Sequence, residues 1–234
     1  MIIPNKFTSK KNKKNYVNSK TYFLDQSKIY EYRLNNTRLL WCKEVKNILK
    51  RNFRFSNKLK INDFGCAYFP FYKELKLSNL KHNYFGYDND KYILNLGIKK
   101  FPELKNKCKK LNIEGFKPIR KANISIVSAL LEHLYEPVKV IKYLIKNTKD
   151  CLILRIPISK KGSFHFIKKT KNNSPWTFNV FKKKDIIDIL EKNNFDVNFH
   201  TDNASQKYQT GTNYIKKLKR KIIIVEAQRI NNEI

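Results

Sequence analysis

The feature that most constrains the fold is a regular alternation of strand-like and helix-like segments that begins near residue 59. Runs rich in apolar and β-branched residues predict strands, and apolar residues at helical spacing predict helices. The strands are predicted at Leu59–Asp63, Tyr84–Asp88, Ile124–Ser128 and Cys151–Pro157, and the helices at Lys91–Lys99 and Pro137–Lys146. Such alternation is typical of parallel strands joined by crossover helices, so we expect an α/β fold.

The end of the chain departs from this alternation. After a helix predicted at Lys183–Asn193, two strand-like segments, Asp196–Asp202 and Arg220–Gln228, are joined by a lysine-rich stretch without helical spacing. We therefore expect an antiparallel hairpin at one end of the sheet. The 234 residues suffice for one such domain, which we place at residues 58–234. Residues 1–57 are expected to form a basic arm, mobile over 1–20, and one or two helices.

The net charge of +31 leaves two interpretations open. Basic proteins attract nucleic acid because phosphate neutralisation supplies most nonspecific affinity. Eight of the 50 basic residues are arginines, however, which leaves 42 lysines, whereas bidentate phosphate recognition favours arginine. The lysines lie along the whole chain among residues that A+T-rich codons encode. Compositional drift is therefore the alternative to attraction toward an anionic substrate or surface.

The cysteines and histidines show no metal-site spacing. Because the cysteines are scattered without a CxxC pair, we expect reduced thiols rather than zinc ligands or disulfides. No apolar run approaches the roughly 20 residues of a transmembrane helix, and the N-terminal segment lacks the apolar core of a secretory signal. We expect a cytoplasmic protein without a transmembrane segment. The residues concerned are Cys42, Cys66, Cys108, Cys151, His82, His133, His165 and His200.

The first predicted strand runs into Asp63–Tyr68, a segment suited to a ligand site because ligands of open parallel sheets bind outside the carboxyl ends of strands. Small residues at Gly65 and Ala67 allow a sharp turn and a close ligand approach, although they could equally pack a strand against a helix. The second strand ends about 20 residues later at Asp88, whose carboxylate can accept two hydrogen bonds from a ribose diol. Asp90 is an alternative, and either acid could cap the next helix.

A third segment, Ser128 to Pro137, has a more specific sequence motif than the two segments above. Ser128 to Pro137 reads SALLEHLYEP, which resembles the S-x-x-L-E-H-L-x-x-P segment after the fourth strand of class I S-adenosylmethionine-dependent methyltransferases. With the two earlier motifs in the same order, the resemblance spans about Lys58–Gln228. It implies a Rossmann-like three-layer sandwich around a mostly parallel, seven-stranded sheet of order 3-2-1-4-5-7-6 with an antiparallel last strand. It also implies S-adenosyl-L-methionine as methyl donor.

The resemblance assigns roles to individual residues. The donor-binding residues would be Asp63, Gly65, Cys66, Ala67, Tyr68, Asp88, Asn112, Ile113 and Ser128. Gly65–Ala67 would face the methionine part of the donor, and Asp88 would hold its ribose. Asn112 would accept from the adenine amino group, with Glu114 as the alternative, and Ser128 would lie beneath the donor.

Three positions depart from the family pattern. Ala67 and Phe69 stand where the family has its second and third glycines, and Asn123 stands where the fourth strand opens with Asp. Phe69 must therefore point away from the ligand or reshape the first helical turn. Phe69 and Asn123 suggest the alternative of a noncatalytic binding domain on the same fold.

The Glu132-His133 pair supplies the candidate catalytic residues. His133 could act as general base in methyl transfer to oxygen, although it could also merely order its loop. In metal-dependent relatives that methylate RNA 3′ ends, a carboxylate three residues before this pair helps bind magnesium. Ala129 occupies that position here, so we predict no catalytic metal.

Acceptor specificity is expected from the basic, aromatic segment Ser159–Phe181, which we interpret as a loop over the donor site. Such a loop could hold a sugar ring with lysines near an anionic group, could track RNA by stacking and charge, or could be a solvated connector. We predict methylation of a small-molecule or glycan-like acceptor. RNA methylation ranks second, because the motifs of base-amino and cytosine-C5 methyltransferases are absent.

Overall fold

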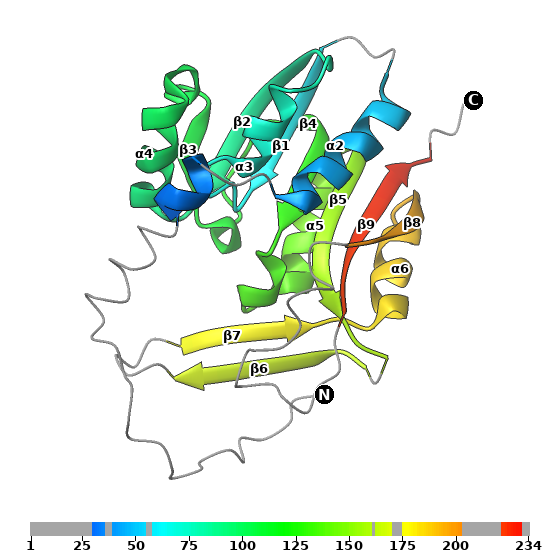
Figure 1. Ribbon diagram of the computed structural model, residues 1–234. Helices are drawn as coiled ribbons and strands as arrows, with labels where there is room; N and C mark the ends of the chain where they lie inside the picture. Colours follow the sequence, from blue (N-terminus) through cyan, green and yellow to red (C-terminus); the bar gives the residue numbers. More distant parts are fainter. Residues whose placement is uncertain are drawn as a thin grey trace.

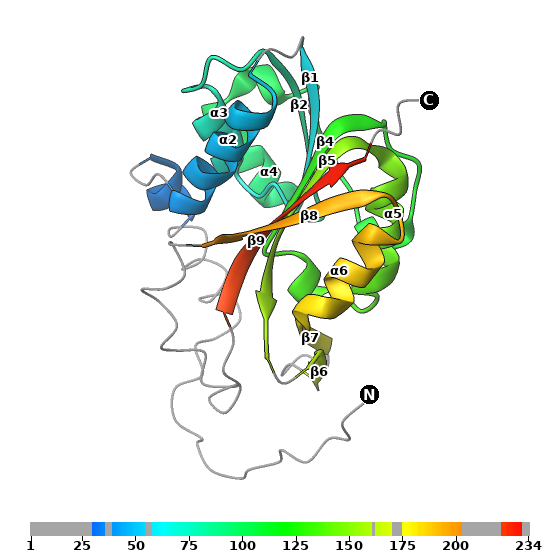
Figure 2. The same cartoon turned by 90° about the vertical axis from the view of Figure 1, so that its right-hand side faces the viewer.

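The computed structural model describes residues 30–35, 39–54, 58–160, 162–169, 175–202 and 221–230. The predicted mobile arm, residues 1–20, lies outside this part of the chain. A seven-stranded sheet forms the middle layer, and helices cover both of its faces (Figures 1 and 2). Within the described segments, no helix is long and apolar enough to cross a membrane.

The sheet has the expected mixed topology. Its strands are β1 (Leu59–Phe64), β2 (His82–Asp88), β3 (Cys108–Lys110), β4 (Ala122–Ser128), β5 (Thr148–Ile158), β8 (Phe195–Thr201) and β9 (Lys221–Arg229). They lie in the order β3-β2-β1-β4-β5-β9-β8, which is 3-2-1-4-5-7-6 when the strands of this sheet alone are counted. The neighbours from β3 to β5 pair parallel, and β9 pairs antiparallel with both β5 and β8. The expected hairpin at one end of the sheet is confirmed. The three-residue β3 had not been predicted.

Two apolar cores flank the sheet. On one face lie α2 (Leu40–Asn52), α3 (Pro70–Leu75), α4 (Lys91–Lys100) and η1 (Pro102–Leu104). On the other face lie η2 (Ile113–Gly115), η3 (Leu131–His133), α5 (Pro137–Asn147) and α6 (Lys183–Glu191). The helix expected before the sheet is therefore confirmed as α2, while the domain boundary placed at residue 57 stays a prediction. All four cysteines are free thiols.

The segment interpreted as a loop after β5 contains a second, two-stranded sheet, so that interpretation is wrong for these residues. Strands β6 (Phe164–Lys169) and β7 (Pro175–Val180) pair antiparallel. Figure 1 shows this hairpin crossing below the carboxyl ends of the central strands. Ser159 N–H donates to Phe181 O and Phe181 N–H donates to Pro157 O, both at 2.9 Å, which ties the hairpin to the end of β5.

Candidate functional site

The loop after β1 is a tight turn held against the end of β2. Gly65 and Ala67 have φ angles of 70° and 46°, in the left-handed region that favours glycine. The N–H groups of Gly65 and Cys66 both donate to Tyr87 O, at 2.8 and 3.1 Å. A Cβ at Gly65 would lie 3.3 Å from Leu130 Cβ, so the glycine permits a close approach between this loop and the segment after β4.

The two candidate acids after β2 make different contacts. Asp90 caps α4, because its side chain accepts from Tyr92 N–H and Ile93 N–H. Asp88 instead faces the loop after β1: its Oδ2 accepts from Ala67 N–H at 2.9 Å, and its Oδ1 accepts from Asp90 N–H at 2.9 Å. Burial raises the pKa of Asp88, and these N–H donors partly oppose that increase. The structure therefore leaves Asp88 as the acid placed at the loop.

Asp63 lies beneath the loop rather than at its surface. Its side chain is 2% exposed and accepts from the Tyr84 hydroxyl at 2.7 Å. Burial raises the pKa of Asp63 to about 7, although the Tyr84 hydrogen bond opposes the shift and the nearby Asp88 adds to it. Asp63 therefore changes its protonation state close to neutral pH, directly under the predicted donor site.

Two other residues of the predicted donor loop turn their side chains inward. Cys66 is buried, and its Sγ lies 2.8 Å from where a Cβ on Gly86 would stand. Tyr68 is buried against the aromatic ring of Tyr30, with ring centroids 5.5 Å apart, and burial raises the pKa of Tyr68 to about 12. A ligand at this loop would therefore meet mainly the backbone of these residues.

The departures at Phe69 and Asn123 are accommodated away from the loop surface. Phe69 adopts a left-handed conformation with φ of 65°, is fully buried, and packs edge-on against Tyr84. A Cβ on Gly97 would lie only 2.5 Å from its ring, so that glycine of α4 makes room for Phe69. Asn123 lies near the amino end of β4, where it accepts from Lys60 N–H and donates to Asp150. Neither residue points into the donor loop.

The predicted adenine-side residues divide into different structural roles. Asn112 Oδ1 accepts from Glu114 N–H at 3.1 Å and so caps η2, while Ile113 is buried in the core. Glu114 Oε1 accepts from Tyr135 N–H and Glu136 N–H, at 2.7 and 2.8 Å. Glu114 thus ties η2 to the start of α5, a long-range contact that the sequence did not reveal.

The segment after β4 brings the remaining predicted residues to the same edge of the sheet. Ser128 ends β4 and is buried, while Ala129 follows with a φ of 53° and is exposed. Glu132 is only 6% exposed, so its side chain turns inward. His133 is exposed at the end of η3. The catalytic roles of Glu132 and His133 stay predictions.

The hairpin β6–β7 holds the turn that carries His133. Asn179 Nδ2 donates to Leu131 O at 2.9 Å and to Leu134 O at 2.7 Å, which brackets η3. The Thr177 hydroxyl donates to His133 O, and the ring nitrogen Nδ1 of His133 lies 3.3 Å from Thr177 O. Because a carbonyl oxygen only accepts, Nδ1 carries the proton in this contact, and in the neutral ring Nε2 is then the acceptor atom.

Sequence reasoning missed Thr177 and Asn179. A signal was present, because apolar and polar residues alternate in the run from Trp176 to Val180. Of the side chains that motivated the acceptor hypothesis, those of Lys160 and His165 belong to the described part of the chain. The others lie outside it: Lys161, Phe164, Phe166, Lys168, Lys169, Lys171 and Trp176.

In the ranges that the structure describes, no three His, Cys, Asp or Glu side chains gather as a metal ion would require. The expected absence of a catalytic metal stays a prediction, to be decided by the chelation experiment below.

No protein-family model and no curated protein matches the sequence. Solved structures do match. One is magnesium protoporphyrin IX methyltransferase from Synechocystis with bound SAH, at a TM-score of 0.61 and 16% identity, over 90% of this chain and 97% of that chain. A second is an S-adenosylmethionine-dependent methyltransferase from Clostridium acetobutylicum, at a TM-score of 0.60 and 13% identity, over 89% of this chain and 99% of that one.

A third match is the glycopeptide N-methyltransferase MtfA complexed with S-adenosyl-L-methionine, at a TM-score of 0.55 and 10% identity, over 81% of this chain and 94% of that chain. These likenesses span nearly the whole of each solved chain. The chain therefore has the fold of class I S-adenosylmethionine-dependent methyltransferases.

Proposed function

We infer that the chain is an S-adenosylmethionine-dependent methyltransferase acting on a small-molecule or glycan-like, anionic acceptor. The observation that carries the donor assignment is the Asp88 carboxylate at the end of β2, 2.9 Å from Ala67 N–H in the loop after β1. In an open parallel sheet this edge is where ligands bind. Structures with this fold have been crystallised with S-adenosylmethionine or its demethylated product.

The residues at this edge fit the proposed donor. The Asp88 carboxylate interacts with the backbone N–H groups of Ala67, Asn89 and Asp90, and a carboxylate has about four acceptor positions, which leaves one for a ribose hydroxyl. The left-handed turn at Gly65 presents the loop backbone to the proposed methionine part, and Asn112 Oδ1 has a second lone pair for the adenine amino group. Glu114 is less suited to adenine because its Oε1 already accepts two backbone N–H groups.

Bound S-adenosylmethionine would supply a sulfonium methyl group for in-line attack by the acceptor. The protein's part is to align the acceptor and to exclude water. His133 Nε2 can accept a proton from an acceptor hydroxyl or ammonium group, because the contact with Thr177 O holds the ring proton on Nδ1. The hairpin that fixes this histidine also carries the basic segment expected to contact the acceptor.

The acceptor class rests on two supports. The segment between β5 and α6 holds Lys160, Lys161, Lys168 and Lys169, which would attract an anionic acceptor. The solved structures with this fold include a magnesium protoporphyrin IX methyltransferase and a glycopeptide N-methyltransferase, which supports a small-molecule or glycan-like acceptor. RNA as the acceptor rests on charge alone, and salt-dependent RNA affinity tests it.

Donor binding measured by calorimetry tests the proposal, with Asp88→Ala and the matched control Asp90→Ala. Loss of the Asp88 carboxylate removes charge-assisted hydrogen bonds to the ribose and should cost about 1.5 to 3 kcal/mol, roughly a tenfold to hundredfold loss of affinity. Asp90→Ala removes a carboxylate two residues away that caps α4 and should leave donor affinity nearly unchanged. Equal affinities in folded Asp88→Ala and wild-type protein would refute the placement.

A further inference from the structure

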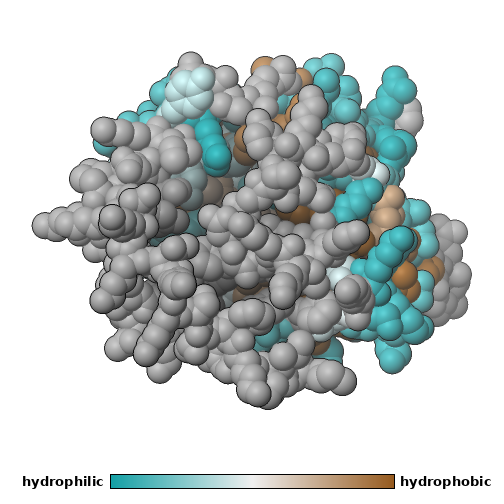
Figure 3. Space-filling model, turned by 60° about the horizontal axis from the view of Figure 1, so that its bottom comes forward, coloured by the Kyte–Doolittle hydropathy of each residue, from teal (hydrophilic) through white to brown (hydrophobic). Residues whose placement is uncertain are grey.

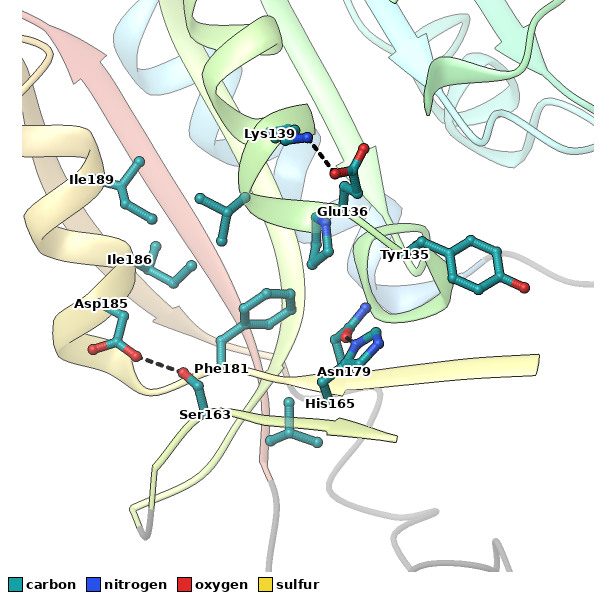
Figure 4. A pocket seen from close by; sticks show the side chains of 13 residues that line it. Tyr135, Glu136, Lys139, Ser163, His165, Asn179, Phe181, Asp185, Ile186 and Ile189 are labelled. Carbon is teal, nitrogen blue, oxygen red and sulfur yellow. Dashed lines mark hydrogen bonds and ion pairs between the residues drawn. The ribbon is translucent and has the colours of Figure 1, made fainter. Parts of the chain in front are cut away.

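A pocket of about 440 Å³ lies away from the donor loop, between the start of α5, the start of α6 and the hairpin. Figure 4 shows Phe181 at its floor, with Ile186 and Ile189 of α6 on one side and His165 and Asn179 of the hairpin on the other. Phe181 and Ile186 are buried, so the floor is apolar. In the view from below, apolar residues are exposed among hydrophilic ones at the right, the side toward α6 (Figure 3).

Two polar side chains in this pocket, Ser163 and Asn179, already use their hydrogen-bond donors. The Ser163 hydroxyl donates to Asp185 Oδ2 at 2.6 Å. Asn179 Nδ2 donates both of its protons to Leu131 O and Leu134 O. Asn179 Oδ1 must therefore be the acceptor in its contact with His165, and His165 Nδ1 must be the donor.

The acceptors are not used up in the same way. With its proton on Nδ1, a neutral His165 ring carries its lone pair on Nε2. Among the described residues that line the pocket, His165 Nε2, the second oxygen of Asp185 and the second oxygen of Glu136 have no donor. Asp185 and Glu136 are exposed, so water meets their free oxygens in the unliganded protein. A ligand that displaces this water has to bring N–H or O–H groups of its own.

The local charge points to the same ligand. Of the charged side chains that line the pocket, two are the carboxylates of Asp185 and Glu136, and one is the ammonium group of Lys139, which is paired with Glu136. Lys182, Lys183 and Lys184 directly precede Asp185 in the sequence but do not line the pocket. The chain as a whole has a net charge of +31 and attracts anions without specificity. A local excess of carboxylates over an apolar floor favours instead a cation with an apolar body.

We propose that this pocket is a second binding site, separate from the donor loop, for a small organic amine that carries an apolar ring. The ring packs on Phe181, Ile186 and Ile189, and the ammonium group donates to the Asp185 carboxylate. Asn179 contacts His165 in the pocket and also bonds the carbonyl oxygens of Leu131 and Leu134 in the turn that carries His133. Only the Asn179 side chain therefore separates an occupant from this turn.

The test is calorimetric titration of the full chain with phenethylamine, and with phenylacetate as an anion that carries the same ring. Phenethylamine is expected to bind saturably at one site, and phenylacetate is expected neither to bind there nor to compete. Because nonspecific attraction by this chain favours the anion, an amine preference cannot come from net charge. Absence of saturable amine binding, or equal binding of the two probes, overturns the proposal.

Matched variants locate the site. Asp185→Asn keeps an acceptor for Ser163 and removes the charge, so it should weaken phenethylamine binding about tenfold or more. Asp188→Asn, one turn along α6 and paired with Lys184, is the control and should leave binding unchanged. Val138→Trp starts from an exposed residue at the pocket wall and should block binding in a protein with unchanged circular dichroism. Equal weakening by both Asp variants, or unaltered binding in Val138→Trp, contradicts the assignment.

A donor-side readout separates this proposal from the proposed function. Affinity for S-adenosylhomocysteine should be the same in wild type and Asp185→Asn, because η3 separates the pocket from the loop after β1. A parallel loss of both affinities in Asp185→Asn would make the pocket part of the donor site and would overturn the proposal. Amine binding in a protein that does not bind S-adenosylhomocysteine would refute the methyltransferase proposal alone.

Discussion

The two sides of the candidate site are held together by different kinds of contact. On the donor side, the loop after β1 is held by backbone groups of the adjacent strand and by Asp88, 21 positions from Ala67 along the chain. On the hairpin side, the turn η3 is held by side chains of β7, with Asn179 bonding carbonyls 48 and 45 positions away. The conformation of the donor side is therefore set by local turns and strand order. The conformation of the hairpin side is set by hydrogen bonds between residues that are far apart in the sequence.

This difference predicts how the two sides respond to change. A loop fixed by backbone turns is sensitive to added atoms and to buried charge. A turn fixed by a few side chains is sensitive to the loss of those side chains. The predictions below test each side with a matched control, beginning with the largest expected effect.

Asp63 makes the donor side pH-dependent. In the folded protein its pKa is about 7, whereas an unfolded aspartate ionises near pH 4. Between these two values the folded state therefore binds more protons than the unfolded state. The contribution of Asp63 to the free energy of unfolding is fully present below about pH 4 and is lost as the pH rises to about 7. Asp63→Asn keeps an acceptor for Tyr84 and removes the ionisation. As the pH rises from about 4 to about 7, the free energy of unfolding of the Asp63→Asn variant should increase relative to that of wild type by a few kcal/mol, at about 1.4 kcal/mol per pKa unit.

Urea unfolding at a series of pH values measures this difference. Asp90→Asn is the control, because asparagine also caps helices and this acid lies at the start of α4. A constant difference between Asp63→Asn and wild type from pH 4 to 8 would show that the buried acid does not titrate as described.

Asn179→Leu tests the hairpin side. Leucine has a similar volume but leaves Leu134 O and His165 Nδ1 without their partner, which should cost about 2 to 3 kcal/mol of unfolding free energy. Amide exchange should accelerate in η3 and stay slow in β1. The control Asn193→Leu removes an exposed amide that bonds only Ile189 O, four positions away, and should change stability by less than about 0.5 kcal/mol. Equal losses in both variants would argue against a long-range clamp.

Gly97→Ala tests how tightly the donor side is packed. In most helices this substitution stabilises by up to about 1 kcal/mol. Here the new Cβ would meet the Phe69 ring at 2.5 Å and Tyr68 C at 3.0 Å, so we expect a loss of about 1 to 3 kcal/mol instead. Thermal or urea unfolding measures whether Gly97→Ala lowers or raises the free energy of unfolding. Gly115→Ala, whose Cβ would have its nearest neighbour at 4.0 Å, is the control, and a gain of stability in Gly97→Ala would contradict the packing described.

The smallest expected effect concerns metal. Once an acceptor is found, turnover should be unchanged by EDTA, because Ala129 stands where metal-dependent relatives have a carboxylate. Loss of turnover in EDTA that magnesium restores would show that catalysis depends on a metal ion.

Much of the donor side could be predicted from the sequence because its signals are local. Strand and helix periods predicted β1, β2, α4, β4 and α5, and the family resemblance carried by the three motifs implied the sheet topology that is observed. The sequence favoured Asp88 over Asp90 because Asp88 ends the predicted strand, but it left Asp90 as an alternative. Their roles are decided by which backbone N–H groups each side chain reaches.

The direction of Phe69 shows why the remainder could not be predicted. The sequence indicated only that a phenylalanine replaces a glycine in the loop. Its place in the core depends on the space that Gly97 leaves, 28 positions later and on another helix. The hairpin was missed because its alternation is short and lies in a lysine-rich stretch that also fits a solvated loop.

The sequence by itself determined the alternating order of strands and helices, the turn after β1 and the acids after β2, because each depends on residues within one or two elements. Only the tertiary structure decided three other features: the pKa of Asp63, the hairpin's hold on the His133 turn and the second pocket. The physical reason is that burial, side-chain hydrogen bonds to distant carbonyls and enclosed space arise only when segments far apart in the chain pack together.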